Sequence, residues 1–116
     1  MARVVDRLSG SARFALAIRT GRRAGSSTLV VHLARPDSEP ASPDAGAPPR
    51  VGFVVSRAVG NAVTRNRVKR RLRELVRAEE LPTGALVVVR ALPPAATASY
   101  MELRRDLARC LSRVTS

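Results

Sequence analysis

The segment Thr64–Arg77, TRNRVKRRLRELVR, constrains the fold of this chain more than any other stretch of its sequence. At about 100° per residue, a helix here gathers all of its apolar residues on one stripe, formed by Val68, Leu72, Leu75 and Val76. Such a stripe has to pack against a sheet or another helix. The opposite side brings together Asn66, Arg70, Arg73 and Arg77. Arg65 and Lys69 flank the stripe on one side, and Arg67 and Arg71 flank it on the other.

The charge of this segment exceeds anything that folding requires. From Arg65 to Arg73, nine residues carry six positive charges and no negative one. Charged surface helices normally mix signs, because like charges at i,i+4 spacing repel each other. The whole chain of 116 residues carries a net charge of +12. We therefore predict a polyanionic partner, and the phosphates of a nucleic acid fit best because they offer both charge and hydrogen-bond acceptors. A membrane surface is disfavoured, since the apolar stripe is committed to the core.

The rest of the pattern predicts one α+β domain over residues 1–116, an α/β sandwich with a single mixed sheet covered by helices. The expected elements, in the order α-β-β-α-β-α, are a helix at Ser11–Thr20, strands at Thr28–Ala34 and Arg50–Ser56, a helix from the cap Asn61 to about Glu80, a strand at Gly84–Arg90, and a last helix opened by the capping box Ser99–Glu102. We expect the second strand to return beside the first, as in a hairpin. The unbroken apolar run of the third strand predicts burial on both of its faces.

Residues 36–49, PDSEPASPDAGAPP, differ in composition from everything around them. They hold five of the eight prolines, three of the nine acidic residues and no base, which predicts a flexible acidic loop with nothing to bury. The single cysteine, Cys110, excludes an internal disulfide and falls on the apolar stripe of the last helix, where a core position is expected. Neither a signal peptide nor a membrane span is recognised, so we expect a cytoplasmic protein.

Catalytic groups are not evident in the sequence. A protein nuclease needs a general base and acid or a carboxylate metal cluster. His32 is the only histidine, and the acidic residues are scattered over helices or lie in the loop. We therefore predict no catalytic residue and no metal site in the protein itself.

Residues 56–74, SRAVGNAVTRNRVKRRLRE, resemble the signature of the bacterial ribonuclease P protein family: a strand, a Gly-Asn turn, and a helix with an Arg-Asn-Arg core followed by further basic positions. Residues 7–21 resemble the first helix of that family, and residues 50–56 resemble the strand before the signature. The resemblance covers nearly the whole chain except the acidic loop and the tail. It implies a left-handed crossover from strand through basic helix to strand, against the general right-handed preference.

The resemblance also implies a function. Family members assist a catalytic RNA, which acts with magnesium, in removing the 5′ leader from precursor tRNA, and they broaden substrate use. The implied partners are this catalytic RNA and precursor tRNA, with no protein partner and no membrane. Carried over position by position, the residues expected to bind RNA are Arg57, Asn61, Arg65, Asn66, Arg67, Lys69, Arg70 and Arg73.

The family further has a cleft between its sheet and its first helix that binds the single-stranded leader, and aromatic residues there can stack on bases. Phe14, Ile18 and His32 fall at the matching positions. Phe14 keeps an aromatic ring and His32 can stack or form hydrogen bonds, whereas Ile18 can only pack. A core position for Phe14 and a half-exposed strand position for His32 are the alternatives. For the chain as a whole, the alternatives are a binding module for another structured RNA and a DNA-binding protein.

Overall fold

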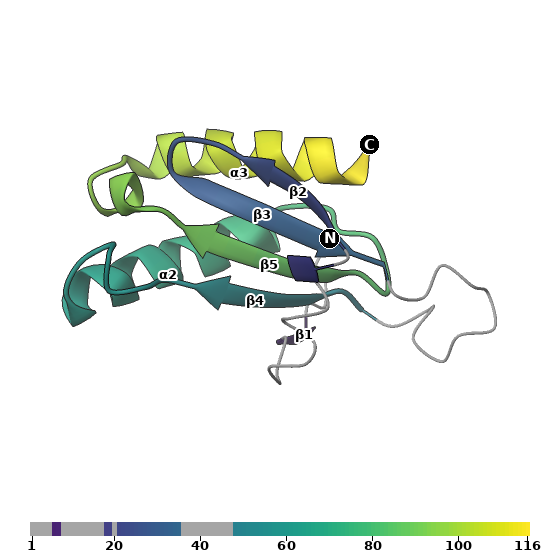
Figure 1. Ribbon diagram of the computed structural model, residues 1–116, viewed down its shortest axis with the longest axis horizontal. Helices are drawn as coiled ribbons and strands as arrows, with labels where there is room; N and C mark the ends of the chain where they lie inside the picture. The colour runs from purple at the N-terminus through teal and green to yellow at the C-terminus, as the bar shows by residue number, and fades with distance from the viewer. Residues whose placement is uncertain (1–5, 8–17, 20, 36–47) are drawn as a thin grey trace.

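Five strands and two long helices make up the computed structural model, which describes residues 6–7, 18–19, 21–35 and 48–116. The strands are β1 (Asp6–Arg7), β2 (Arg22–Gly25), β3 (Leu29–Ala34), β4 (Arg50–Val54) and β5 (Leu86–Ala91). The helices are α2 (Ala62–Arg77) and α3 (Tyr100–Thr115), with the short 3₁₀ helix η1 (Pro93–Ala96) between β5 and α3. Figure 1 shows α2 and α3 running along the sheet from the same end of the molecule.

The strands form one sheet in the order β1-β4-β5-β3-β2. β5 pairs in parallel with β4 and in antiparallel with β3, so that Val89 lies opposite both Phe53 and Val31. The mixed sheet that the sequence predicted is therefore confirmed. β5 lies at the centre of the sheet, where its apolar residues are buried on both faces. A central position stabilises such a strand because both of its faces leave water.

The prediction that the strand at Arg50–Ser56 returns beside the strand at Thr28–Ala34, as in a hairpin, is wrong. β3 and β4 are separated by β5, and β4 instead pairs with β5 and with β1. The reason is that the most apolar strand takes the central place although it comes later in the sequence. The segment between β3 and β4 is long enough to carry the chain across this gap.

Two short strands at the sheet edges were not predicted. In β2 only Ala24 is buried, while Arg22, Arg23 and Gly25 are exposed, so the strand has no apolar alternation to recognise. β1 has only two residues. The predicted helix at Ser11–Thr20 lies outside the described residues except for Ile18 and Arg19, which are both helical.

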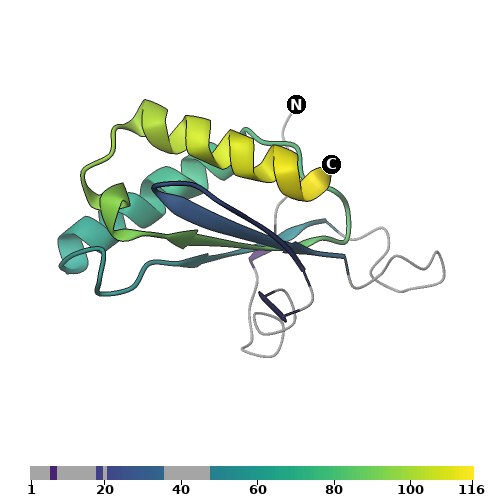
Figure 2. The same ribbon diagram turned by 45° about the horizontal axis from the view of Figure 1, so that its top comes forward.

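The main hydrophobic core lies between one face of the sheet and both helices (Figure 2). Leu72 of α2 and Leu107 of α3 are fully buried there, together with Val31 and Val89 of the sheet. A smaller cluster of Ala34, Leu86 and Val88 lies on the opposite face of the sheet. The predicted burial of the strand at Gly84–Arg90, which is β5, on both of its faces is therefore confirmed.

Both helix starts form as the capping residues predicted. Asn61 Oδ1 accepts a hydrogen bond from the Thr64 backbone N–H at 2.9 Å, and Ser99 Oγ accepts from Glu102 N–H at 3.1 Å. α2 ends at Arg77, three residues before the predicted end, and Pro82 follows. β4, α2 and β5 form the expected βαβ unit, and its left-handed crossover stays a prediction.

The predicted loop 36–49 is described only at its last two residues. Pro48 and Pro49 belong to no helix or strand, Pro49 is buried and Pro48 is partly buried, and β4 begins at the next residue, Arg50. Cys110 is 1% exposed within the core, as its place on the apolar stripe predicted, and burial raises the pKa of its thiol.

The packing of α2 makes a direct prediction about stability. Replacing Leu72 with Ala removes a fully buried side chain and should lower the free energy of unfolding by about 2–5 kcal/mol, measured by urea denaturation. Val63→Ala on the same helix is the control, because Val63 is 75% exposed and should change stability by less than about 0.5 kcal/mol. Equal effects of the two substitutions would contradict the assigned orientation of α2.

Candidate nucleic-acid interface

A tight turn between β4 and α2 decides where the basic helix begins. The backbone N–H of Val59 donates to Ser56 O at 3.1 Å, and that of Gly60 donates to Arg57 O at 3.2 Å. Val59 anchors the turn in the core, which leaves Arg57 exposed. A Cβ atom at Gly60 would lie 3.0 Å from Thr64 Cγ2, so a side chain there would require the Thr64 side chain to shift, and the positive φ of 157° at Gly60 also favours glycine. The turn therefore holds Arg57 close to the first turn of α2.

The start of α2 is itself electropositive. Its first backbone N–H groups point out of the helix end, and its first turn contains no acidic residue. The capping bond uses the Asn61 side-chain oxygen, while the residue as a whole remains exposed. The Asn61 amide nitrogen is thus available to donate to an anion at the helix end.

The outer side of α2 carries an exposed row that we call the α2 basic face. Its four residues are exposed, as the periodicity predicted, and they are Asn66, Arg70, Arg73 and Arg77. The buried residues of the helix are the predicted stripe, with Val68 and Leu72 both at 0% exposure. Among the described residues, no ion pair neutralises an arginine of this face. The face is therefore rigidly placed, and its guanidinium groups have no protein partner in this part of the chain.

The residues flanking the stripe are half-buried, and one of them has a structural contact. These residues are Arg65, Arg67, Lys69 and Arg71. Arg67 Nη2 donates to the backbone oxygen of Ala96 at 2.8 Å and so ties α2 to η1. The Nε atoms of Arg65 and Arg67 are buried without a hydrogen-bond partner among the described residues. The sequence pattern missed the Arg67 contact, because its partner lies 29 residues further along the chain.

His32 lies on the face of the sheet opposite the two helices. It sits directly across from Arg23 on β2 and from Val88 on β5. His32 is only 6% exposed, so the alternative of a half-exposed strand position is wrong. Burial lowers the pKa of His32 below its usual 6.5, and the nearby charges of Arg23 and Arg90 lower it further. The imidazole is therefore neutral at neutral pH, and its Nδ1 has no hydrogen-bond partner among the described residues.

Of the other two residues expected in the leader cleft, the structure describes Ile18 but not Phe14. Ile18 is 47% exposed, which is normal for a single apolar side chain on a protein surface and leaves it open to a contact. Phe14 lies outside the described residues. The sequence also missed Arg23 and Arg90, whose charges act on His32 from the two neighbouring strands, because strand pairing cannot be read from local sequence.

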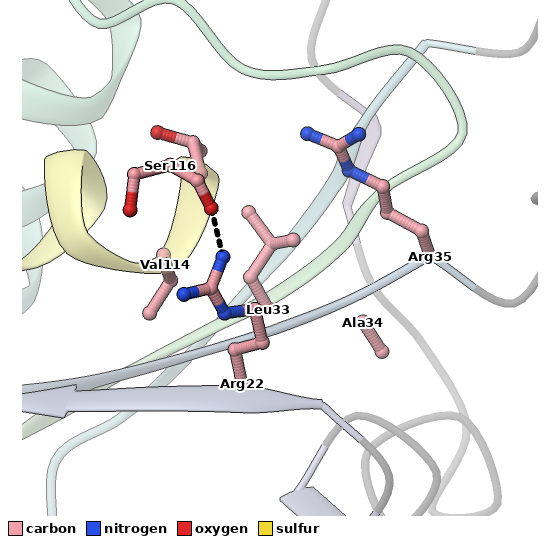
Figure 3. Close-up of a pocket in the computed structure, with 7 residues that line it drawn as sticks. Arg22, Leu33, Ala34, Arg35, Val114 and Ser116 are labelled. Atoms are coloured by element: carbon pink, nitrogen blue, oxygen red, sulfur yellow. Dashed lines mark hydrogen bonds between the residues drawn. The ribbon is translucent and has the colours of Figure 1, made fainter.

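A pocket of about 250 Å³ lies at the end of α3, away from the start of α2 (Figure 3). Its walls include Arg22, Leu33, Arg35 and Val114, and Arg22 Nη1 donates to the backbone oxygen of Ser116. A cationic side chain on the last carbonyl groups of a helix is a stabilising cap. The pocket contains no acid, base or nucleophile suited to catalysis, so we interpret this contact as structural.

The described residues offer no protein catalytic centre. Within this part of the chain, no group of three His, Cys, Asp or Glu side chains is placed to hold a metal ion. Nor is any of its helices long and apolar enough to cross a membrane. The fold and site thus define a basic α+β protein whose cationic helix is fixed on a mixed sheet, with an exposed row of cations that suits the phosphates of a nucleic acid.

Comparisons with known proteins identify the family. The ribonuclease P family model matches residues 3–115. A ribonuclease P protein component from a Nocardioides species is 60% identical over 116 residues, covering 98% of this chain and 95% of the relative. The component from Streptomyces bikiniensis is 55% identical over 112 residues, covering 94% of this chain and 91% of the relative. The solved ribonuclease P protein from Thermotoga maritima superposes with a TM-score of 0.76 at 25% identity, covering 94% of this chain and 97% of that one.

The chain belongs to the ribonuclease P protein family. Its role is that of the protein subunit of ribonuclease P, in which the RNA carries the catalysis. The family and function that the residues 56–74 indicated are therefore confirmed. The match of residues 3–115 also accounts for the absence of a catalytic constellation among the described side chains.

The burial of His32 predicts a pH dependence of stability. The unfolded chain binds a proton at His32 near pH 6.5, whereas the folded chain binds it only at lower pH. The contribution of neutral His32 is therefore fully present above about pH 6.5 and is lost as the pH falls toward the lowered folded pKa. Thermal midpoints should fall more steeply between about pH 7.5 and 5.5 in the wild type than in His32→Gln. Parallel pH profiles of the two proteins would contradict this assignment.

Proposed function

We propose that the α2 basic face binds the catalytic RNA of ribonuclease P, with Asn66, Arg70 and Arg73 as its central contacts. The observation that carries this proposal is the combination of a buried stripe with an exposed row of cations that forms no ion pair among the described residues. Guanidinium groups bind phosphate oxygens in pairs of parallel hydrogen bonds. Because the helix is held by its core contacts, little ordering is needed on binding.

The residues around this face extend the contact. Lys69 and Arg65 lie beside it on α2, and Arg57 and Asn61 add donors at the helix start. Arg67 has a double role in the proposal: Nη2 holds η1 through Ala96, and the donors of Nη1 are directed to RNA, while the buried Nε stays within the protein. These residues form one continuous set around the first turns of α2, which suits the backbone of a folded RNA.

We further propose that the opposite face of the sheet binds the 5′ leader of precursor tRNA, through Phe14, Ile18 and His32. A neutral, buried imidazole whose Nδ1 has no hydrogen-bond partner among the described residues is suited to a nucleobase, because it can accept or donate a hydrogen bond without a charge. Arg23 and Arg90 lie on the strands next to His32 and are both exposed, so they are suited to the leader phosphates. In this role the protein positions the substrate and broadens the range of substrates used.

The division of labour follows from the charges. The protein would screen the repulsion between two polyanions, the catalytic RNA and precursor tRNA, while the RNA hydrolyses one phosphodiester. The described residues provide no cluster of metal ligands, so we assign the magnesium ions to the RNA. We propose the cytoplasm as the site of this activity, with no membrane and no protein partner involved.

The α2 basic face can be tested separately from folding. Arg70→Ala together with Arg73→Ala should weaken binding to the catalytic RNA and lower the slope of log affinity against log salt by about 2, because two phosphate contacts are lost. The thermal midpoint should stay nearly unchanged, since both side chains are exposed.

The matched control replaces the same two residues with Lys, which keeps the charge and loses the paired hydrogen bonds. This variant should retain most of the salt dependence and lose part of the affinity. An alanine variant that folds normally and binds RNA with the wild-type affinity and salt dependence would refute the proposed contact.

A further inference from the structure

A second basic surface lies on α3, outside residues 56–74, which resemble the family signature. Arg105, Arg109 and Arg113 follow each other at i,i+4 spacing, and all three are exposed. At about 100° per residue, this spacing places them in one slightly slanted row on the outer side of the helix. We call this row the α3 arginine ridge. The buried stripe of α3, which includes Leu103, Leu107 and Leu111, fixes the ridge on the sheet.

The acidic residues of α3 are engaged elsewhere. The helix has only two, Glu102 and Asp106. Glu102 belongs to the capping box, where its Oε1 accepts from Ser99 Oγ at 3.3 Å. Asp106 Oδ2 accepts from the nearly buried Thr28 hydroxyl at 2.5 Å, which turns the carboxylate toward the β2–β3 side of the helix. Over the described part of the chain, no ion pair joins a carboxylate to an arginine of the ridge.

Three like charges in such a row disfavour the helix, because neighbours at i,i+4 repel by a few tenths of a kcal/mol per pair. Nothing in the packing of α3 requires them, since the stripe and the capping box already hold the helix in place. The same reasoning applied to α2 predicted its phosphate partner. Glu102 and Asp106 lie three residues before Arg105 and Arg109, but each accepts a hydrogen bond from a side-chain hydroxyl. α3 therefore keeps an excess of exposed arginines, which fits a polyanion better than it fits solvent.

The position of the ridge favours RNA as that polyanion. α2 and α3 pack against each other on the same face of the sheet, so their outer sides belong to one surface layer (Figure 2). Packed helices lie about 8–10 Å apart. An RNA held on α2 therefore brings further phosphates within reach of α3. His32 and Arg23 lie on the other face of the sheet, so the ridge is separate from the proposed leader surface.

We propose that the α3 arginine ridge is a second RNA-binding surface, which holds the phosphate backbone of a segment of the catalytic RNA other than the one bound by α2. The proposal rests on the RNA-subunit role but not on the contacts proposed for α2. Three phosphate contacts here contribute about 2–3 to the slope of log affinity against log salt.

Site-directed cleavage of the RNA tests this location directly. Ser112→Cys places an exposed thiol one helical turn after Arg109, and Val63→Cys places one before Asn66 on α2. Each variant carries an iron–EDTA group on the new cysteine in a complex of the full chain, its ribonuclease P RNA and precursor tRNA. The wild type treated in the same way is the background control, because Cys110 is 1% exposed and burial raises its pKa.

The proposal expects the Ser112→Cys probe to cut the catalytic RNA in a segment that the Val63→Cys probe does not cut. If Ser112→Cys gives only background cleavage while Val63→Cys cuts clearly, the proposal is overturned. It is also overturned if Ser112→Cys cuts only the RNA segment that Val63→Cys cuts. If neither probe cuts, the proposed function of α2 fails together with this inference.

A binding measurement adds an independent check. Replacing Arg105, Arg109 and Arg113 with Gln keeps residues that favour helix and removes the charge. This variant should lower the salt slope by about 2–3 at an unchanged thermal midpoint, while the corresponding Lys variant should keep it. An unchanged slope in the Gln variant overturns the proposal.

Discussion

The burial of one apolar stripe, formed by Val68, Leu72, Leu75 and Val76, is the interaction on which the rest of this structure depends. Without it, a helix that carries six positive charges in nine residues would lose stability through repulsion. Burial of four aliphatic side chains outweighs that cost, since each contributes about 1.5–3 kcal/mol. The packing therefore allows the charges to be concentrated, and it also fixes the direction in which they point.

The sequence was sufficient to predict those features of the fold and site that depend on residues close together in the chain. The 3.6-residue period identified both faces of α2 and the core stripe of α3, and the capping residues Asn61 and Ser99 marked the two helix starts. It was insufficient where contacts are distant in sequence. The central place of β5, the bond from Arg67 to Ala96, and the burial of His32 all depend on strand pairing or on segments brought together by the fold. The edge strand β2 left no signal because only Ala24 among its residues is buried.

The molecule separates positioning from chemistry. Its described side chains form no catalytic or metal-binding group, while its cations gather on exposed helix faces and beside His32. Such a protein can contribute to a reaction between two polyanions by lowering their repulsion and fixing their relative placement, which are effects on binding and orientation. The family match assigns the hydrolysis itself to the RNA.

The most direct test of this account is reconstitution of the enzyme with a matching catalytic RNA and precursor tRNA at low magnesium concentration. The account predicts that the protein strongly stimulates release of the 5′ leader there and that the stimulation shrinks at high magnesium, where ions alone can screen the phosphates. Binding of the RNA without any stimulation of cleavage would contradict the account, and tighter binding to duplex DNA than to structured RNA would contradict the RNA partner itself.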